Sequence, residues 1–168
     1  MTNTSEKSLS DLFLLKIKAL YDIETKLVKA LPKMAEHASN LALATGFKDH
    51  LKETKEHVTR LEKIFHMLDA KPEKTEVEGI QGMIHDADWI IKHVKNKQAL
   101  DAALIASAQY VEHYEMAGYG TAKEWAELLK LDEAARLLEE TLEEEVGADE
   151  KLNDLATSKI NELALVAG

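Results

Sequence analysis

Helix-breaking residues are scarce in this chain, which has two prolines and seven glycines among its 168 residues. Most of the remaining chain consists of residues with high helix propensity, and no alternating pattern typical of strands is present. Long segments carry apolar residues at steps of three and four, the period of an amphipathic helix. These segments predict four long helices and one shorter connecting helix, over residues 8–41, 47–69, 77–94, 98–129 and 132–164.

Local signals place the ends of these helices. Pro32 lies inside the first helical pattern and is expected to kink it. The dipeptide Thr45-Gly46 is expected to separate the first two helices, and Asp132 to cap the last one.

The lengths of the connections predict the topology. Short breaks join the first long helix to the second and the third to the fourth, so each pair should form an antiparallel hairpin. The long 77–94 connection lets the third long helix run parallel to the second. A four-helix bundle with one long crossover is the ferritin-like arrangement. We therefore expect an all-α, ferritin-like four-helix bundle with a short crossover helix, forming one domain over residues 1–168.

Composition excludes several classes of function. The chain has no cysteine, so disulfides, thiolate metal sites and cysteine nucleophiles are excluded, and a cytoplasmic location is expected. The net charge of −10 argues against nucleic acid as a partner. No apolar run reaches the roughly 20 residues that a membrane span needs, and no signal peptide is recognisable. Phosphate-binding loops and serine-nucleophile motifs are also absent.

Two apolar helix faces each carry a glutamate near the middle. Glu24 interrupts the face of the first helix, and Glu115 interrupts the face of the third long helix. A buried carboxylate is costly unless it is paired or bound to a metal. The positions of these two residues therefore indicate a site rather than a simple core.

The other two long helices each offer a pair of metal-ligating residues one turn apart. The pairs are Glu53 with His57, and Glu145 with Asp149. Residues at i and i+4 point the same way, so both members could reach one ion. Glu24 and Glu53 are 53 − 24 = 29 residues apart, and Glu115 and Glu145 are 145 − 115 = 30 apart. A pseudo-twofold bundle would bring the four acidic positions together, as in di-iron and di-manganese carboxylate bundles.

The pattern departs from the usual ligand set of those bundles. The usual pair is Glu-x-x-His, whereas position 54, three residues before His57, is a threonine. The last long helix has no histidine, with Asp149 as the nearest substitute, and Glu112 adds an acid one turn before Glu115. A site rich in carboxylates suits iron or manganese, and magnesium or calcium remain alternatives.

Five segments carry a resemblance that covers nearly the whole chain. They are Leu20-Tyr-Asp-Ile-Glu24, His50-Leu-Lys-Glu-Thr54, Asp101-Ala-Ala-Leu-Ile-Ala, Val111-Glu-His-Tyr-Glu115 and Thr141-Leu-Glu-Glu-Glu145. In these segments the sequence resembles the YciE/YciF family of bacterial, stress-associated, ferritin-like proteins.

The resemblance implies a ferritin-like fold, a homodimer and metal at the bundle centre. Carried over by position, it implies an acidic set of Glu24, Glu53, Glu112, Glu115 and Glu145. By analogy with related bundles, Glu53 and Glu145 would bridge two metals, and Glu24 and Glu115 would be terminal ligands. His57 and Glu112 would complete the site, which would hold two ions per chain, iron or manganese.

Ordinary roles compete with these assignments. Glu143, Glu144 and Glu145 could form a solvated face, since runs of charge on helices usually do. His50 could contact a neighbouring helix or a carboxylate, or orient Glu53 or another ligand. His113 lies off the apolar face.

The aromatic residues and the remaining histidines have simpler expected roles. Tyr21 and Tyr114 are expected to pack with their hydroxyls on carboxylates, and Trp89 and Trp125 to act as packing anchors. The other histidines, expected at the surface, are His37, His66, His85 and His93.

Three functions follow from this pattern. The first is a protein that oxidises Fe(II) or consumes peroxide at a dinuclear site. The second is a non-enzymatic stress protein whose metals stabilise the bundle or a dimer. The third is a mini-ferritin that stores iron in a cage, for which the sequence offers no nucleation feature.

Overall fold

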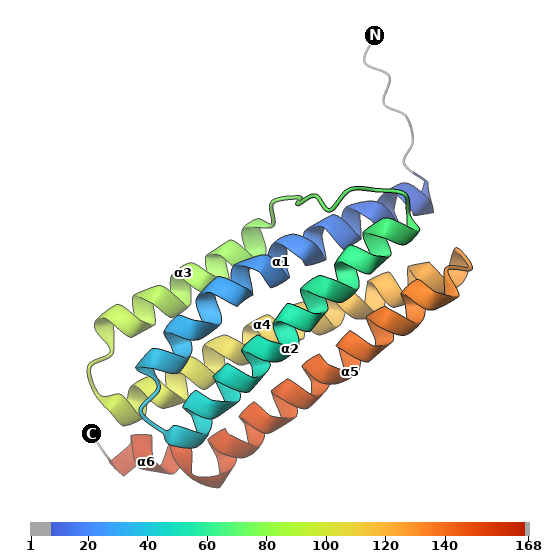
Figure 1. Cartoon of the computed structure of the whole chain (residues 1–168). Helices are drawn as coiled ribbons and strands as arrows, with labels where there is room; N and C mark the ends of the chain where they lie inside the picture. The colour runs from blue at the N-terminus through green and yellow to red at the C-terminus, as the bar shows by residue number, and fades with distance from the viewer. Residues whose placement is uncertain (1–7, 167–168) are drawn as a thin grey trace.

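The computed structural model describes residues 8–166, and helices make up nearly all of this part of the chain (Figure 1). Four long helices form the bundle: α1 (Leu9–His37), α2 (Leu41–Met67), α4 (Lys97–Leu128) and α5 (Asp132–Leu155). The crossover helix is α3 (Glu78–His93). A π-helical segment (Ala156–Ile160) and α6 (Asn161–Val166) follow α5.

The long helices lie side by side as two antiparallel hairpins (Figure 1). Helices α1 and α2 form the first hairpin, and α4 and α5 form the second. The long connection that contains α3 returns the chain, so that α4 runs in the same direction as α2. Helix α3 packs against α4 and α1 on the outside of the bundle. The predicted ferritin-like four-helix bundle with a crossover helix is confirmed.

The predicted break at Thr45-Gly46 is wrong. Helix α2 already begins at Leu41, and the Asn40 side chain caps it by accepting hydrogen bonds from the backbone of its first turn. The Asp101 carboxylate of α4 accepts further bonds from the backbone and hydroxyl of Ser39 and from the backbone of Asn40. These contacts fix the turn so that α2 begins 47 − 41 = 6 residues earlier than predicted, and Gly46 lies inside α2.

The other helix ends differ in smaller ways. Helix α1 passes through Pro32 and ends at His37. Asp132, predicted to cap α5, lies instead in its first turn, where its negative charge interacts favourably with the helix dipole. Leu131 occupies the cap position, and no side chain caps the helix there. The last predicted helix is interrupted by the π-helical segment rather than continuous to residue 164.

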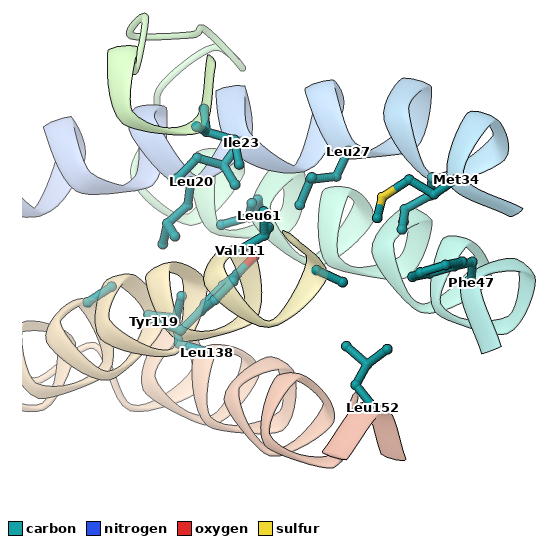
Figure 2. Packing of buried hydrophobic residues seen from close by; sticks show 14 of the residues in the cluster. Leu20, Ile23, Leu27, Met34, Phe47, Leu61, Val111, Tyr119, Leu138 and Leu152 are labelled. Carbon is teal, nitrogen blue, oxygen red and sulfur yellow. The ribbon is translucent and has the colours of Figure 1, made fainter. Parts of the chain in front are cut away.

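One apolar core runs along the bundle axis (Figure 2). Ile17, Leu61 and Leu138 have 1% or less of their surface exposed. Trp89, predicted to be a packing anchor, is instead 60% exposed on α3, whereas Trp125 packs partly buried against the core. None of the helices within residues 8–166 combines the length and apolar character that a bilayer span requires.

Candidate metal centre

A layer of polar side chains interrupts the core near its middle. Each long helix contributes at least one residue, and each side chain is nearly or completely buried: Glu24 from α1, His50 and His57 from α2, Glu112 and Glu115 from α4, and Glu145 from α5. Glu24 and Glu145, 145 − 24 = 121 positions apart along the chain, meet here because the two hairpins place their midpoints at the same height. Four carboxylates in one dry layer need compensation.

These residues form two groups that share one member. In the first group, His50, Glu112, Glu115 and Glu145 each offer a ligand atom within 4.8 Å of the others. In the second group, Glu24, His57 and Glu145 do the same. Glu145 therefore lies between two sets of candidate ligands.

Many polar atoms of this layer have no hydrogen-bond partner within the described residues. Both carboxylate oxygens of Glu115 and of Glu145 are unpaired, as are one oxygen each of Glu24 and Glu112 and the Nδ1 atom of His57. Buried polar atoms are almost always paired, and each unpaired group costs about 1–3 kcal/mol. Unpaired atoms that converge on one layer fit a site that positive ions complete.

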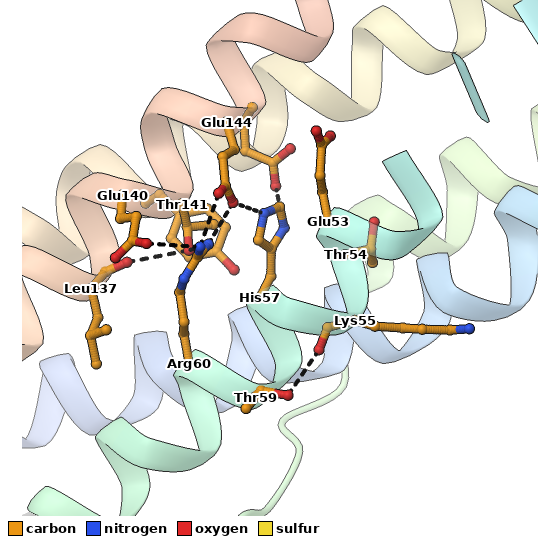
Figure 3. Close-up of polar contacts among 12 residues, drawn as sticks. Glu53, Thr54, Lys55, His57, Thr59, Arg60, Leu137, Glu140, Thr141 and Glu144 are labelled. Carbon is orange, nitrogen blue, oxygen red and sulfur yellow. Dashed lines mark hydrogen bonds and ion pairs between the residues drawn. The ribbon is translucent and has the colours of Figure 1, made fainter. Parts of the chain in front are cut away.

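An ion-pair network fixes the His57 ring through its Nε2 atom, on the side of the ring away from the buried layer (Figure 3). Its Nε2 lies 2.8 Å from Glu144 Oε2, and Arg60 donates hydrogen bonds to both oxygens of that carboxylate. Burial opposes ionisation of Glu144, but its contacts with Arg60 and His57 outweigh burial and lower its pKa. An ionised Glu144 directs the Nε2–H outward and turns Nδ1 toward the layer, where it lies 3.1 Å from Glu145 and 3.3 Å from Glu24. Ligating histidines commonly have such a carboxylate behind them.

Tyr119 orients the carboxylate of Glu24. The tyrosine is 1% exposed, and its hydroxyl donates a hydrogen bond to Glu24 Oε1. Burial and the charges of Glu24 and Glu145 raise the pKa of Tyr119 well above its usual value, so the hydroxyl keeps its proton. Tyr119 was not among the residues predicted from the sequence. Its position one turn after Glu115, on the same apolar face, was the available signal.

His50 approaches the layer from the other end. Its Nε2 lies 3.4 Å from Glu112 and 3.7 Å from Glu145, and its Nδ1 lies 3.4 Å from Glu53. Burial disfavours the charged imidazole, but the contact with Glu53 and the charge of Glu112 outweigh it and raise the pKa of His50 to about 9. His50 thus contacts Glu53 and also the buried carboxylates, two of the roles that the sequence left open for it.

The layer holds protons when no ion is bound. Burial raises the pKa of Glu24 and Glu115, and it raises the pKa of Glu112 to about 8. For His57, burial acts in the opposite direction, but contacts with Glu145 and Glu24 raise its pKa to about 11. Metal ions would displace these protons, because ligands bind metal in their deprotonated form.

Glu53 and Asp149 lie outside both groups. The Glu53 side chain is 32% exposed and contacts His50 and, at 3.6 Å, Lys151. Asp149 accepts a hydrogen bond from Gln109 and lies 3.4 Å from the exposed His113. Their role as ligands stays a prediction. The structure brings together the other five predicted residues and adds His50.

The remaining polar predictions have mixed outcomes. Tyr21 packs on Phe65 and donates a hydrogen bond to Glu62, as expected. Tyr114 is 38% exposed and lies against Gly79 rather than in the core. The four histidines expected at the surface are exposed: His37, His66, His85 and His93.

A cavity adjoins the layer where α2 and α5 face each other. Its volume is about 150 Å³, and His50, Glu53 and Glu112 line its polar wall. Gly46 and Lys151, on the outer surface of the bundle, also line it, so the cavity connects the layer with the surface.

The fold and this layer define a class: ferritin-like four-helix bundles with a buried cluster of carboxylates and histidines. More particularly, the chain belongs to the family described as Domain of unknown function (DUF892), whose family model matches residues 8–165. It is 39% identical over 159 residues to Protein YciF of Escherichia coli (strain K12), covering 94% of this chain and 96% of that protein.

Two solved structures share the fold. The crystal structure of the E. coli stress protein YciF matches with a TM-score of 0.87 and 39% identity, over 93% of this chain and 99% of that one. YcfI, a putative structural protein from Rhodopseudomonas palustris, matches with a TM-score of 0.87 and 40% identity, over 91% of this chain and 98% of that one. The resemblance to the YciE/YciF family that the sequence motifs indicated is confirmed.

Proposed function

We propose that the buried layer binds two metal ions, iron or manganese, and that the protein uses them to oxidise Fe(II) or to consume peroxide. The observation that carries the proposal is the position of Glu145. Its two unpaired oxygens face two separate groups of candidate ligands, which is the arrangement that a bridging carboxylate needs.

Each ion would have its own donors. His50, Glu112 and Glu115 would hold one ion, Glu24 and His57 would hold the other, and Glu145 would contact both. A donor set of carboxylate oxygens and imidazole nitrogens suits iron and manganese better than the softer metals that thiolates select. A pair of redox-active ions supplies the two electrons that reduce peroxide.

The protein itself supplies orientation and proton control. Tyr119 fixes the Glu24 carboxylate, and the Arg60–Glu144 pair fixes the ring of His57. The apolar core above and below the layer excludes water, which strengthens the contacts between charges inside it. His50 stands between the buried carboxylates and the cavity. With its Nε2 toward the layer, its Nδ1 proton is directed at Glu53, 3.4 Å away.

The test is the metal content of the purified chain after anaerobic Fe(II) loading, followed by stopped-flow absorbance on adding O₂ or peroxide. Wild type should bind two irons per chain and oxidise them. Glu145→Gln should lose at least one iron and most of the oxidation. Glu143→Gln, an exposed neighbour in the same helix, is the matched control and should behave as wild type. If Glu145→Gln keeps full metal content, the proposed ligand set is wrong.

A structural role is the second candidate. All four long helices contribute to the layer, so ions there would tie both hairpins together and stabilise the fold directly. One structurally similar protein carries the description putative structural protein. In this case chelation lowers the melting temperature, while bound iron shows no response to either oxidant.

The oligomeric state of the protein distinguishes a homodimer from an iron-storage cage. The family resemblance predicts a homodimer, whereas a storage cage would elute as a large oligomer and take up many more than two irons per chain. Size-exclusion chromatography with light scattering measures this directly.

A further inference from the structure

The cavity beside the buried layer has two chemically different halves. On the side of the buried layer it is lined by His50 and Glu112, here called the His50–Glu112 wall. The apolar part of its lining includes the side chains of Phe47, Ala148 and Leu152. Figure 2 shows Phe47 on α2 and Leu152 on α5 at the same end of the bundle. A water molecule or H₂O₂ gains little from such a surface, because apolar walls stabilise apolar groups.

The size of the cavity limits its occupant. Its volume is about 150 Å³, and an apolar cavity of about this volume holds a benzene-sized molecule. The space therefore fits a short branched alkyl or phenyl group, with a small polar group directed to His50 and Glu112. Long acyl chains are too large for it.

The mouth of the cavity disfavours anions. Asp49 and Glu53 lie there with a single ammonium group, Lys151, whose Nζ is 3.6 Å from Glu53. The whole chain carries a net charge of −10. A carboxylate or phosphate would meet like charge at this rim, which costs affinity. A neutral molecule avoids that penalty.

We propose that this cavity binds the organic group of a small, neutral alkyl hydroperoxide, with its two peroxide oxygens at the His50–Glu112 wall. The assignment of a hydroperoxide rests on the proposed function. The reaction is ROOH + 2 Fe(II) + 2 H⁺ → ROH + H₂O + 2 Fe(III): the O–O bond breaks, and two Fe(II) supply the two electrons. The alcohol product keeps the alkyl group and leaves through the same cavity.

Gly46 offers a way to fill the cavity without disturbing the core. It lines the cavity, and a Cβ atom added there meets nothing within 4 Å. It also lies inside α2, where leucine has a higher helix propensity than glycine. Gly82→Leu is the matched control: Gly82 lies in α3, away from the cavity, and its added Cβ also meets nothing within 4 Å. Ala148→Leu fills the cavity from the α5 side.

The first measurement uses the metal-free protein and so does not depend on the proposed function. Titration with tert-butanol, followed by ¹H–¹⁵N NMR, should give saturable shifts at Phe47, Ala148 and Leu152. Gly46→Leu and Ala148→Leu should weaken the binding about tenfold, and Gly82→Leu should leave it unchanged. Shifts that do not saturate, or that persist equally in both filled variants, overturn the proposal.

The second measurement uses Fe(II)-loaded protein under anaerobic conditions. Gly46→Leu should slow oxidation by tert-butyl hydroperoxide about tenfold and leave oxidation by H₂O₂ unchanged. An equal effect on both peroxides refutes the assignment of the cavity to the alkyl group. If tert-butanol binds but neither peroxide oxidises the iron, the proposed function and the hydroperoxide assignment fail, and a binding site for small neutral molecules remains.

Discussion

Replacing Glu115 with leucine should make the metal-free protein more stable. Glu115 is completely buried on α4, and neither of its oxygens has a hydrogen-bond partner. Burial, together with the charges of Glu145, Glu24 and Glu112, raises its pKa well above the usual value. The side chain thus costs free energy in the folded state unless an ion is bound, and leucine of similar size removes that cost.

The expected size of the effect follows from the same contacts. A buried polar group without a hydrogen-bond partner costs about 1–3 kcal/mol, and an apolar residue of similar volume removes that cost. In a domain of this size each kcal/mol corresponds to about 2–4 °C in the melting temperature. The metal-free variant should therefore melt roughly 2–12 °C above the metal-free wild type, from the product of those two ranges. Added Fe(II) or Mn(II) should raise its melting temperature much less than that of the wild type.

Thermal and urea denaturation after chelation measure this difference, with circular dichroism to confirm helix content. Glu124→Leu is the control, since Glu124 lies exposed on the same helix and its replacement should change stability by less than about 0.5 kcal/mol. A metal-free Glu115→Leu protein that is less stable than wild type would refute the reasoning, because it would show that the carboxyl group is already satisfied by the fold.

Three further outcomes can be measured. The stability of the metal-free protein should fall as pH rises from about 5 to about 9. The raised pKa values of Glu112 (about 8) and His50 (about 9) make the folded state hold protons that the unfolded state releases. Urea denaturation across this pH range measures the effect, and a flat profile contradicts it. Tyr119→Phe removes the donor to Glu24 and should cost the metal-free protein about 1–3 kcal/mol by the same assay. Asp101→Asn weakens three hydrogen bonds at the α1–α2 turn and should also cost about 1–3 kcal/mol, without changing metal content.

The helices and their pairing were predictable because they depend on local signals. Apolar periodicity and the few strong breakers identify four long helices, and connection lengths identify the hairpins. The turn between α1 and α2 was not predictable in this way. Asp101, more than 60 residues away in sequence, stabilises it, so a glycine nearby appeared to be the better signal although it lies inside a helix.

The sequence could predict which face of each helix carries the site, but not which residue on that face reaches it. Successive residues turn by about 100°, so His50, Thr54 and His57 lie within about 60° of one another, and Glu53 lies to one side of them. Its 32% exposed side chain agrees with this position. Glu53 was predicted as a ligand because a Glu–His pair was expected on this helix. The buried Thr54 shows that the face pointing into the core is instead the one that carries His50 and His57.

The π-helical segment after α5 has a consequence for how small molecules would reach the layer. It allows Ala156 and Ile160 to remain buried and turns α6 back against α4, which closes that end of the bundle (Figure 1). Traffic through the cavity therefore crosses the seam between α2 and α5, where the two hairpins meet, rather than following the bundle axis. Because this cavity already reaches the surface, the side chains at its mouth, rather than fraying of the helix ends, would set the pace of exchange.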